Sequence, residues 1–196
     1  MKRALIAATG LLLAVAPVVA QPAPAGQVTT ISVSVQRQYA AVKTNLTQAA
    51  EKMPEADYGF KPSTMPEVRT YGQLFAHVAN AHFAFCAAAK GVPNPNQGKN
   101  LETLLKTKAE FVKALVDSFA FCDDAYAALT EANANEPVTQ GRGQIARAAL
   151  LANNVTHDNE MYGTSGVYLR AKNIVPPSTE GEPARGSGGR GRGGQQ

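Results

Sequence analysis

The sequence has 196 residues, with 19 Lys and Arg, 15 Asp and Glu, and a formal net charge of +4. Lys2 and Arg3 lie in the first twenty residues, and three Arg and two Glu lie from Glu180 onward, which leaves 14 basic and 13 acidic residues between them. This near-neutral middle part argues against a phosphate-binding surface, so we expect no nucleic-acid partner.

Residues 1–20, MKRALIAATGLLLAVAPVVA, have a basic start, an apolar run and a small-residue end, which is the pattern of a secretory signal peptide. The apolar run is shorter than the roughly 20 residues of a membrane span, so we expect no span after signal removal. The first cysteine is Cys86, which argues against a lipoprotein anchor. We therefore expect an exported protein, periplasmic or extracellular, with an uncleaved anchor as the alternative.

A short linker, residues 21–27, precedes a series of helical patterns with apolar residues at spacings of three and four. We expect helices at about residues 31–53, 70–91, 100–132 and 144–172, separated by loops without convincing strand alternation. This pattern predicts an all-α fold, a four-helix bundle spanning residues 28–178.

The last residues, 179–196, are dense in Gly and poor in apolar side chains, so we expect a disordered tail. Its GRGRGG run is similar to RNA-binding segments. In so short a run, a flexible tail is the favoured interpretation.

Cys86 and Cys122 are the only cysteines. Because an exported protein matures where disulfides persist, we expect them to pair, with two buried thiols as the alternative. Both lie toward the ends of their predicted helices, so pairing requires a bundle in which those ends are level. No C-x-x-C motif supports thiol redox catalysis.

The sequence has three histidines, His77, His82 and His157. His77 and His82 point about 140° apart on one helix, so they cannot share a compact site. His157 and Met161 lie one turn apart on the last helix, on a face that also carries Asn154. Polar groups inside a bundle must be paired or bind something, so this face is either a polar network or the wall of a ligand pocket.

Three segments, RTYGQLFAHVANAHFAFCAAAKG, SFAFCDDAYAAL and THDNEMYGTSGVYLRAKNIVPPS, resemble the exported branch of the DinB-like superfamily of four-helix metal-binding proteins. The resemblance covers about residues 28–178. It implies a divalent metal, zinc or nickel, held by one His of the second helix and two His at i and i+4 on the last helix. His77 and His157 match two of these positions, and His82 matches none.

Met161 occupies the third metal position, where the family pattern HDNEHYG has His. The site can be degenerate, can be completed by a carboxylate such as Asp158 or Glu160, or can prefer a soft ion, because a thioether suits Cu(I) better than zinc or nickel. Asp158 and Glu160 lie on other sectors of the helix, so we favour the degenerate or weakened site. Plain core filling is the other interpretation of Met161.

Two classes of function follow from this resemblance. The chain is an exported protein with a His-based metal or small-ligand site, or a non-catalytic helical binding or structural module that has lost the metal. Some members of the superfamily are metal-dependent thiol transferases, and a transferase or hydrolase is a third alternative, which requires the metal. We expect a small-molecule ligand, and a homodimer stays open. If the bundle has a pocket, we expect it to be formed by His77, His157, Met161, Asn154 and Tyr168, with Asn80 beside His77.

Overall fold

The structure is a computed structural model that describes residues 28–180. The predicted signal peptide, the linker at residues 21–27 and the tail beyond residue 180 lie outside the described residues. No helix of the described part is both long and apolar enough to cross a membrane.

The first two long helices begin and end close to the predicted residues. Helix α1 spans Ile31–Lys52 and ends just before Pro54, while α2 spans Tyr71–Lys90. Thr70 caps α2 through a capping box with Gln73. Gly91 follows α2 with φ at 66°, a conformation that glycine adopts without strain.

The third predicted helix is divided in two, which corrects our expectation of one helix over residues 100–132. Helix α3 spans Leu101–Leu104 and α4 spans Lys108–Ala127. Thr107 caps α4, and the Glu110 carboxylate accepts hydrogen bonds from the Lys106 and Thr107 amides. This capping box starts a new helix where apolar periodicity suggested continuity.

A short hairpin precedes the last helix, although we predicted no strand there. Strands β1, Pro137–Gln140, and β2, Gly143–Ala146, pair antiparallel. Gly141 has φ at 59°, which lets the chain reverse between the strands. Helix α5 then spans Arg147–Ala171. Two single turns complete the fold, η1 at Glu55–Asp57 and η2 at Pro177–Thr179.

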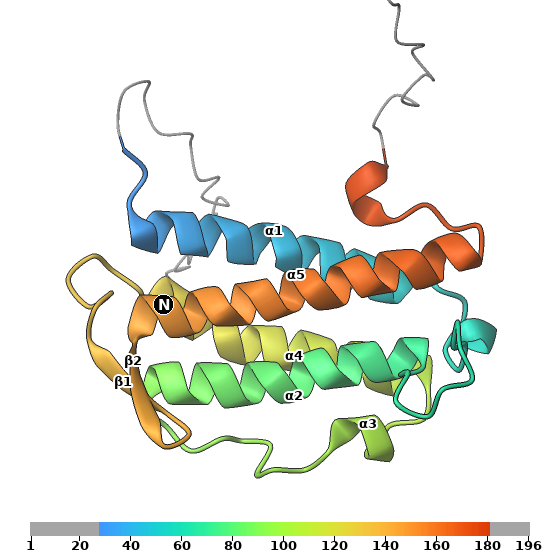
Figure 1. The fold of residues 1–196 in the computed structure, drawn as a ribbon, viewed down its shortest axis with the longest axis horizontal. Helices are drawn as coiled ribbons and strands as arrows, with labels where there is room; N and C mark the ends of the chain where they lie inside the picture. Colours follow the sequence, from blue (N-terminus) through green and yellow to red (C-terminus); the bar gives the residue numbers. More distant parts are fainter. Residues whose placement is uncertain (1–27, 181–196) are drawn as a thin grey trace, which may run out of the picture.

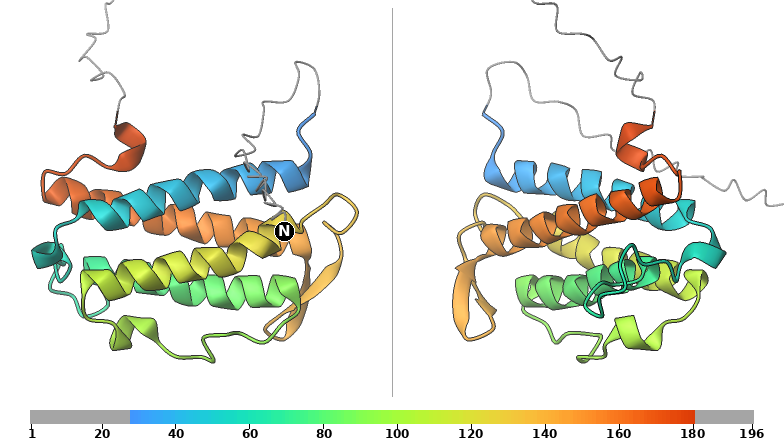
Figure 2. Two further views of the ribbon diagram at one scale, coloured as in Figure 1. Left: turned by 180° about the vertical axis from the view of Figure 1, so that it is seen from behind. Right: turned by 45° about the vertical axis from the view of Figure 1, so that its right-hand side comes forward.

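The long helices form two layers, with α1 beside α5 in one and α2 beside α4 in the other (Figures 1 and 2). Helices α2 and α4 run parallel, because residues 91–107 return along the bundle before α4 begins. Two contacts along this pair of helices have the same sequence offset of 36 residues, His82 with Ser118 and Cys86 with Cys122, as parallel helices require. The overall fold is the all-α bundle predicted.

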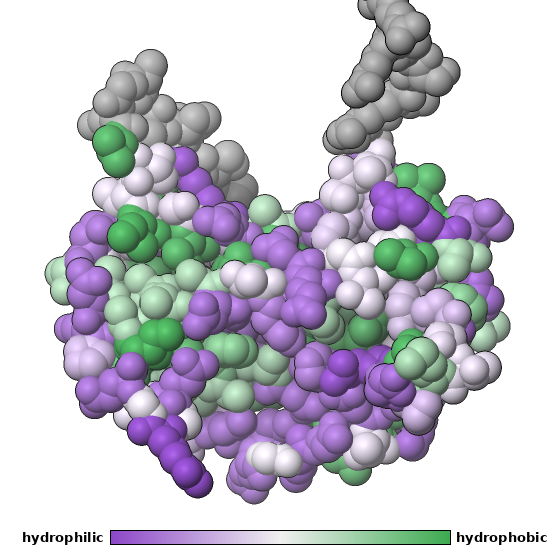
Figure 3. All heavy atoms as spheres, in the orientation of Figure 1, coloured by the Kyte–Doolittle hydropathy of each residue, from purple (hydrophilic) through white to green (hydrophobic). Residues whose placement is uncertain are grey.

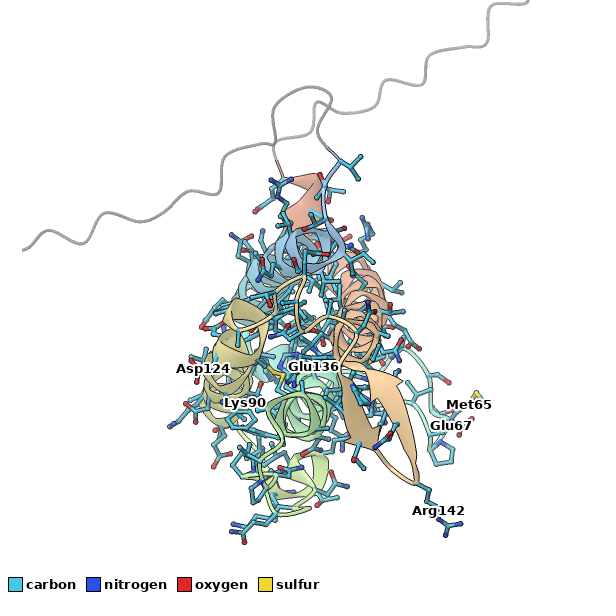
Figure 4. All side chains as sticks on the ribbon, turned by 90° about the vertical axis from the view of Figure 1, so that its left-hand side faces the viewer. Met65, Glu67, Lys90, Asp124, Glu136 and Arg142 are labelled. Atoms are coloured by element: carbon cyan, nitrogen blue, oxygen red, sulfur yellow. A yellow bond between two sulfur atoms is a disulfide. The ribbon has the colours of Figure 1, made fainter. Side chains whose placement is uncertain are left out.

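The parallel arrangement brings the two cysteines level. A disulfide joins Cys86 to Cys122, with their Cα atoms 5.3 Å apart and both side chains buried. The end-on view of Figure 4 shows this bond inside the bundle and Arg142 extending from the hairpin.

Candidate functional site

His77 lies on α2, on the side that faces α5, with 29% of its side chain exposed. Its Nδ1 is 2.8 Å from a carboxylate oxygen of Glu102, whose other oxygen accepts a hydrogen bond from Arg69 Nε. Burial lowers the pKa of His77, and the bond to Glu102 opposes this only in part. His77 is therefore neutral at neutral pH, with Nδ1–H donating to Glu102 and Nε2 left to accept or coordinate.

His157 lies opposite, on α5, with its ring centroid 5.0 Å from that of His77 and 20% of its side chain exposed. Its Nδ1 is buried and has no hydrogen-bond partner in the described structure. The nearest carboxylate oxygen, on Asp158, is 3.8 Å away, which is too far for a hydrogen bond. The two imidazoles thus form a pair, called here the histidine pair.

Met161 follows His157 by one turn and is buried, with 8% of its surface exposed. The two carboxylates that could replace Met161 as the third ligand are engaged elsewhere. Asp158 is fully buried against His82, and Glu160 is exposed to solvent. Within residues 28–180 no group of three His, Cys, Asp or Glu side chains could hold a metal ion.

His82 takes no part in the histidine pair. Its Nδ1 is 2.9 Å from Ser118 Oγ, and its Nε2 is 2.9 and 3.0 Å from the two oxygens of Asp158. All three side chains are fully buried. This Ser, His and Asp arrangement therefore joins α2, α4 and α5 inside the bundle and is closed to a substrate.

The charge of Asp158 is set by the two histidines beside it. Burial alone would raise the pKa of this carboxyl, but the neighbouring His82 and His157 outweigh burial and hold the pKa below its usual range. Asp158 is therefore ionised at neutral pH, and it accepts a further hydrogen bond from the Asn154 amide.

The other residues that we assigned to a pocket have structural partners. Asn154 donates to Tyr126, and the Tyr168 hydroxyl donates to the backbone oxygen of Arg69. Asn80, expected beside His77, instead accepts from the Leu101 amide and holds the loop after α2.

Glu102 is the partner of His77 that sequence reasoning missed. It lies on α3, 25 residues from His77, and the loop between them gives no periodic signal that would link the two. The one local signal was Asn100. Its side chain caps α3 and so fixes the start of the helical turn that carries Glu102.

The chain is thus a helical bundle in which a histidine of α2 and one of α5 face each other. The sequence model of the DinB superfamily matches residues 38–164, more than half of the chain. The chain belongs to the DinB superfamily, which confirms the resemblance at that level. A comparison with curated proteins finds no match.

Proposed function

We propose that this chain is an exported, non-catalytic binding protein of the DinB superfamily, and that the histidine pair is its ligand site. One observation carries this proposal. Two imidazoles from different helices face each other at 5.0 Å at the surface of a buried core, and Glu102 orients one of them. Export rests on the pattern of the first twenty residues.

The donor set fits zinc or nickel poorly. A catalytic zinc site takes three protein ligands drawn from imidazole, thiolate and carboxylate, whereas the pair offers two imidazoles beside the neutral thioether of Met161. The hydrogen bond from His77 to Glu102 is nevertheless the kind of support that metal-bound histidines use. We infer a weakened descendant of a three-ligand site, and we derive no metal-dependent transferase or hydrolase step.

Metal content of the purified mature protein, measured by mass spectrometry after incubation with zinc or nickel, tests this proposal. We expect the natural protein to stay well below stoichiometric loading, and Met161→His to hold about one ion per chain. His157→Ala introduced into Met161→His removes that ion. The proposal fails if the natural protein holds about one zinc per chain and His157→Ala releases it.

Cu(I) is the second candidate ligand, and it is favoured by the position of Met161. A thioether one turn from an imidazole on one helix, facing a second imidazole, is a donor set that soft ions prefer. Under reducing conditions, Met161→Leu should weaken Cu(I) binding in competition with a chromophoric chelator. Equal affinity of the two proteins would remove this candidate.

A further inference from the structure

A cavity of about 190 Å³ lies between α2, α5 and the hairpin. Phe85 and Ala88 of α2 and Leu150 of α5 form its apolar wall, and residues 139–141 of the hairpin form its rim. Figure 3 shows apolar residues among polar ones on the part of this face nearest the hairpin. An apolar cavity of about 150 Å³ is enough for benzene, so this one is large enough for a single six-membered ring.

The cavity and the histidine pair both lie between α2 and α5. Ala84 and Leu150, which line the cavity, are each seven residues from a histidine of the pair, so each shares the helix face of that histidine, about 10 Å along the axis. Phe85 links the two places, since it lines the cavity and its ring centroid is 6.4 Å from that of His157.

The cavity wall selects for a neutral group. No charged side chain lines it, and its polar members are Thr139 and Gln140, both exposed on the hairpin. Burying an uncharged ring there needs no compensating ion pair, whereas burying a charge would be costly.

We propose that this cavity holds one apolar ring of the ligand whose polar head contacts the histidine pair. The inference rests on the proposed ligand site and adds the chemical class of the ligand: a small molecule with a hydrogen-bonding or metal-binding head joined by a short linker to one uncharged ring. The hairpin is then the specificity element of the site, because it supplies the rim that the bundle alone lacks.

A pair of probes separates the head from the ring. 4-(2-phenylethyl)imidazole carries an imidazole head, a two-carbon linker and a phenyl ring, and 4-ethylimidazole lacks only the ring. Each is titrated into the folded mature protein, carrying isotope labels on histidine rings and alanine methyls, and followed by NMR. The His77 and His157 signals report the head, and the Ala84 and Ala88 methyl signals report the ring.

We expect both probes to shift the histidine signals, and only the phenyl probe to shift the two alanine methyls. Partial burial of a phenyl ring should make the phenyl probe bind at least about tenfold more tightly. Phe85→Ala, which removes the wall between the cavity and the pair, should abolish this difference in affinity between the two probes. Ala120→Leu, on an exposed part of α4, is the control variant and should bind both probes as the natural protein does.

The outcomes distinguish the two proposals. Shifts confined to the histidines, with equal affinity for both probes, would overturn the ring cavity and leave the ligand site standing. Shifts confined to the alanines, or shifts of neither set, would overturn both, because no head would then lie at the histidine pair. An affinity difference that survives Phe85→Ala would also overturn the ring cavity.

Discussion

Asp158 shows how a single buried residue connects the core to the candidate site. Its carboxylate pairs with His82 on one side and lies 3.8 Å from His157 on the other, and no part of it reaches solvent. Removing one partner of a buried, hydrogen-bonded pair leaves the other polar group without compensation, which is more costly than losing an exposed pair. The residue that supports the site electrostatically is therefore also a structural one.

Asp158→Ala should destabilise the protein by about 3–5 kcal/mol in urea unfolding, because it leaves the buried imidazole of His82 without its carboxylate. Asp117→Ala is the matched control. Asp117 forms an exposed pair with Lys113 on one helix, and its loss should change stability by less than about 0.5 kcal/mol. Similar losses of stability in both variants would show that the buried pair contributes no more to stability than the exposed one.

Acid should weaken the same interaction. The pKa of Asp158 is lowered on folding, so its contribution is complete above the ordinary carboxyl pKa of about 4 and is lost as pH falls through the lower folded value. The stability of Asp158→Ala should accordingly change less than that of the natural protein as pH falls below about 4.

At the scale of single residues, the sequence identifies the histidines but not the carboxylates that they contact. The spacing of His77 and His82 predicts only that they do not share one site, and the family resemblance is what pairs His77 with His157; in the structure these two rings lie together while His82 is buried against Asp158. The acidic partners, Glu102 and Asp158, come from other elements, and helical periodicity carries no information on which elements meet.

Within the elements, two glycines of long helices have opposite surroundings. A Cβ atom added to Gly72 of α2 would lie 2.5 Å from a ring carbon of Phe111, whereas one added to Gly163 of α5 would meet nothing within 4 Å. Gly72 therefore lets α4 approach α2 closely, next to the loop where the Gly72 amide donates to the Tyr58 carbonyl. Gly163 serves no such packing role.

Gly72→Ala should destabilise the protein by about 1–3 kcal/mol, because Phe111 is buried and must shift to make room. Gly163→Ala should instead stabilise it by about 0.5–1 kcal/mol, because alanine is the better helix former at an open position. Thermal unfolding of both variants measures the difference. Two changes of the same sign would contradict the packing argument.

The elements that sequence patterns missed are those set by local hydrogen bonds. Apolar periodicity continues from Leu104 to Tyr126, so it could not reveal that Thr107 and Glu110 start a second helix. The strands of the hairpin have four residues each, and Val138 with Ile145 is their one pair of large apolar residues, so the strands are too short for an alternating signal. The long helices were predictable because each repeats its apolar face over several turns.

Across the whole molecule, tyrosines join helices that are distant in sequence. The hydroxyl of Tyr39 donates to a backbone oxygen of α4, that of Tyr71 to one of α1, and that of Tyr126 to one of α5. Tyr58, in the connection after η1, donates in the same way to Ala50. Burial is the largest cause that raises the pKa of each of these four hydroxyls.

Alkaline pH should therefore unfold this bundle cooperatively. The unfolded chain releases tyrosine protons near pH 10, while the folded chain keeps them because the four pKa values are raised. Above about pH 10 the free energy of unfolding then falls by up to about 1.4 kcal/mol per pH unit for each of these tyrosines. Tyrosinate absorbance and helical circular dichroism, recorded together, test this.

We expect the tyrosinate of the buried group to appear only as helical circular dichroism is lost. Tyr39→Phe removes one of the four protons, so the free energy of unfolding should fall less steeply with pH, by about 1.4 kcal/mol per pH unit. All six tyrosines of the chain ionising while the helical signal is intact would contradict the argument, because hydroxyls that bind carbonyls of neighbouring helices cannot lose their protons without breaking those contacts.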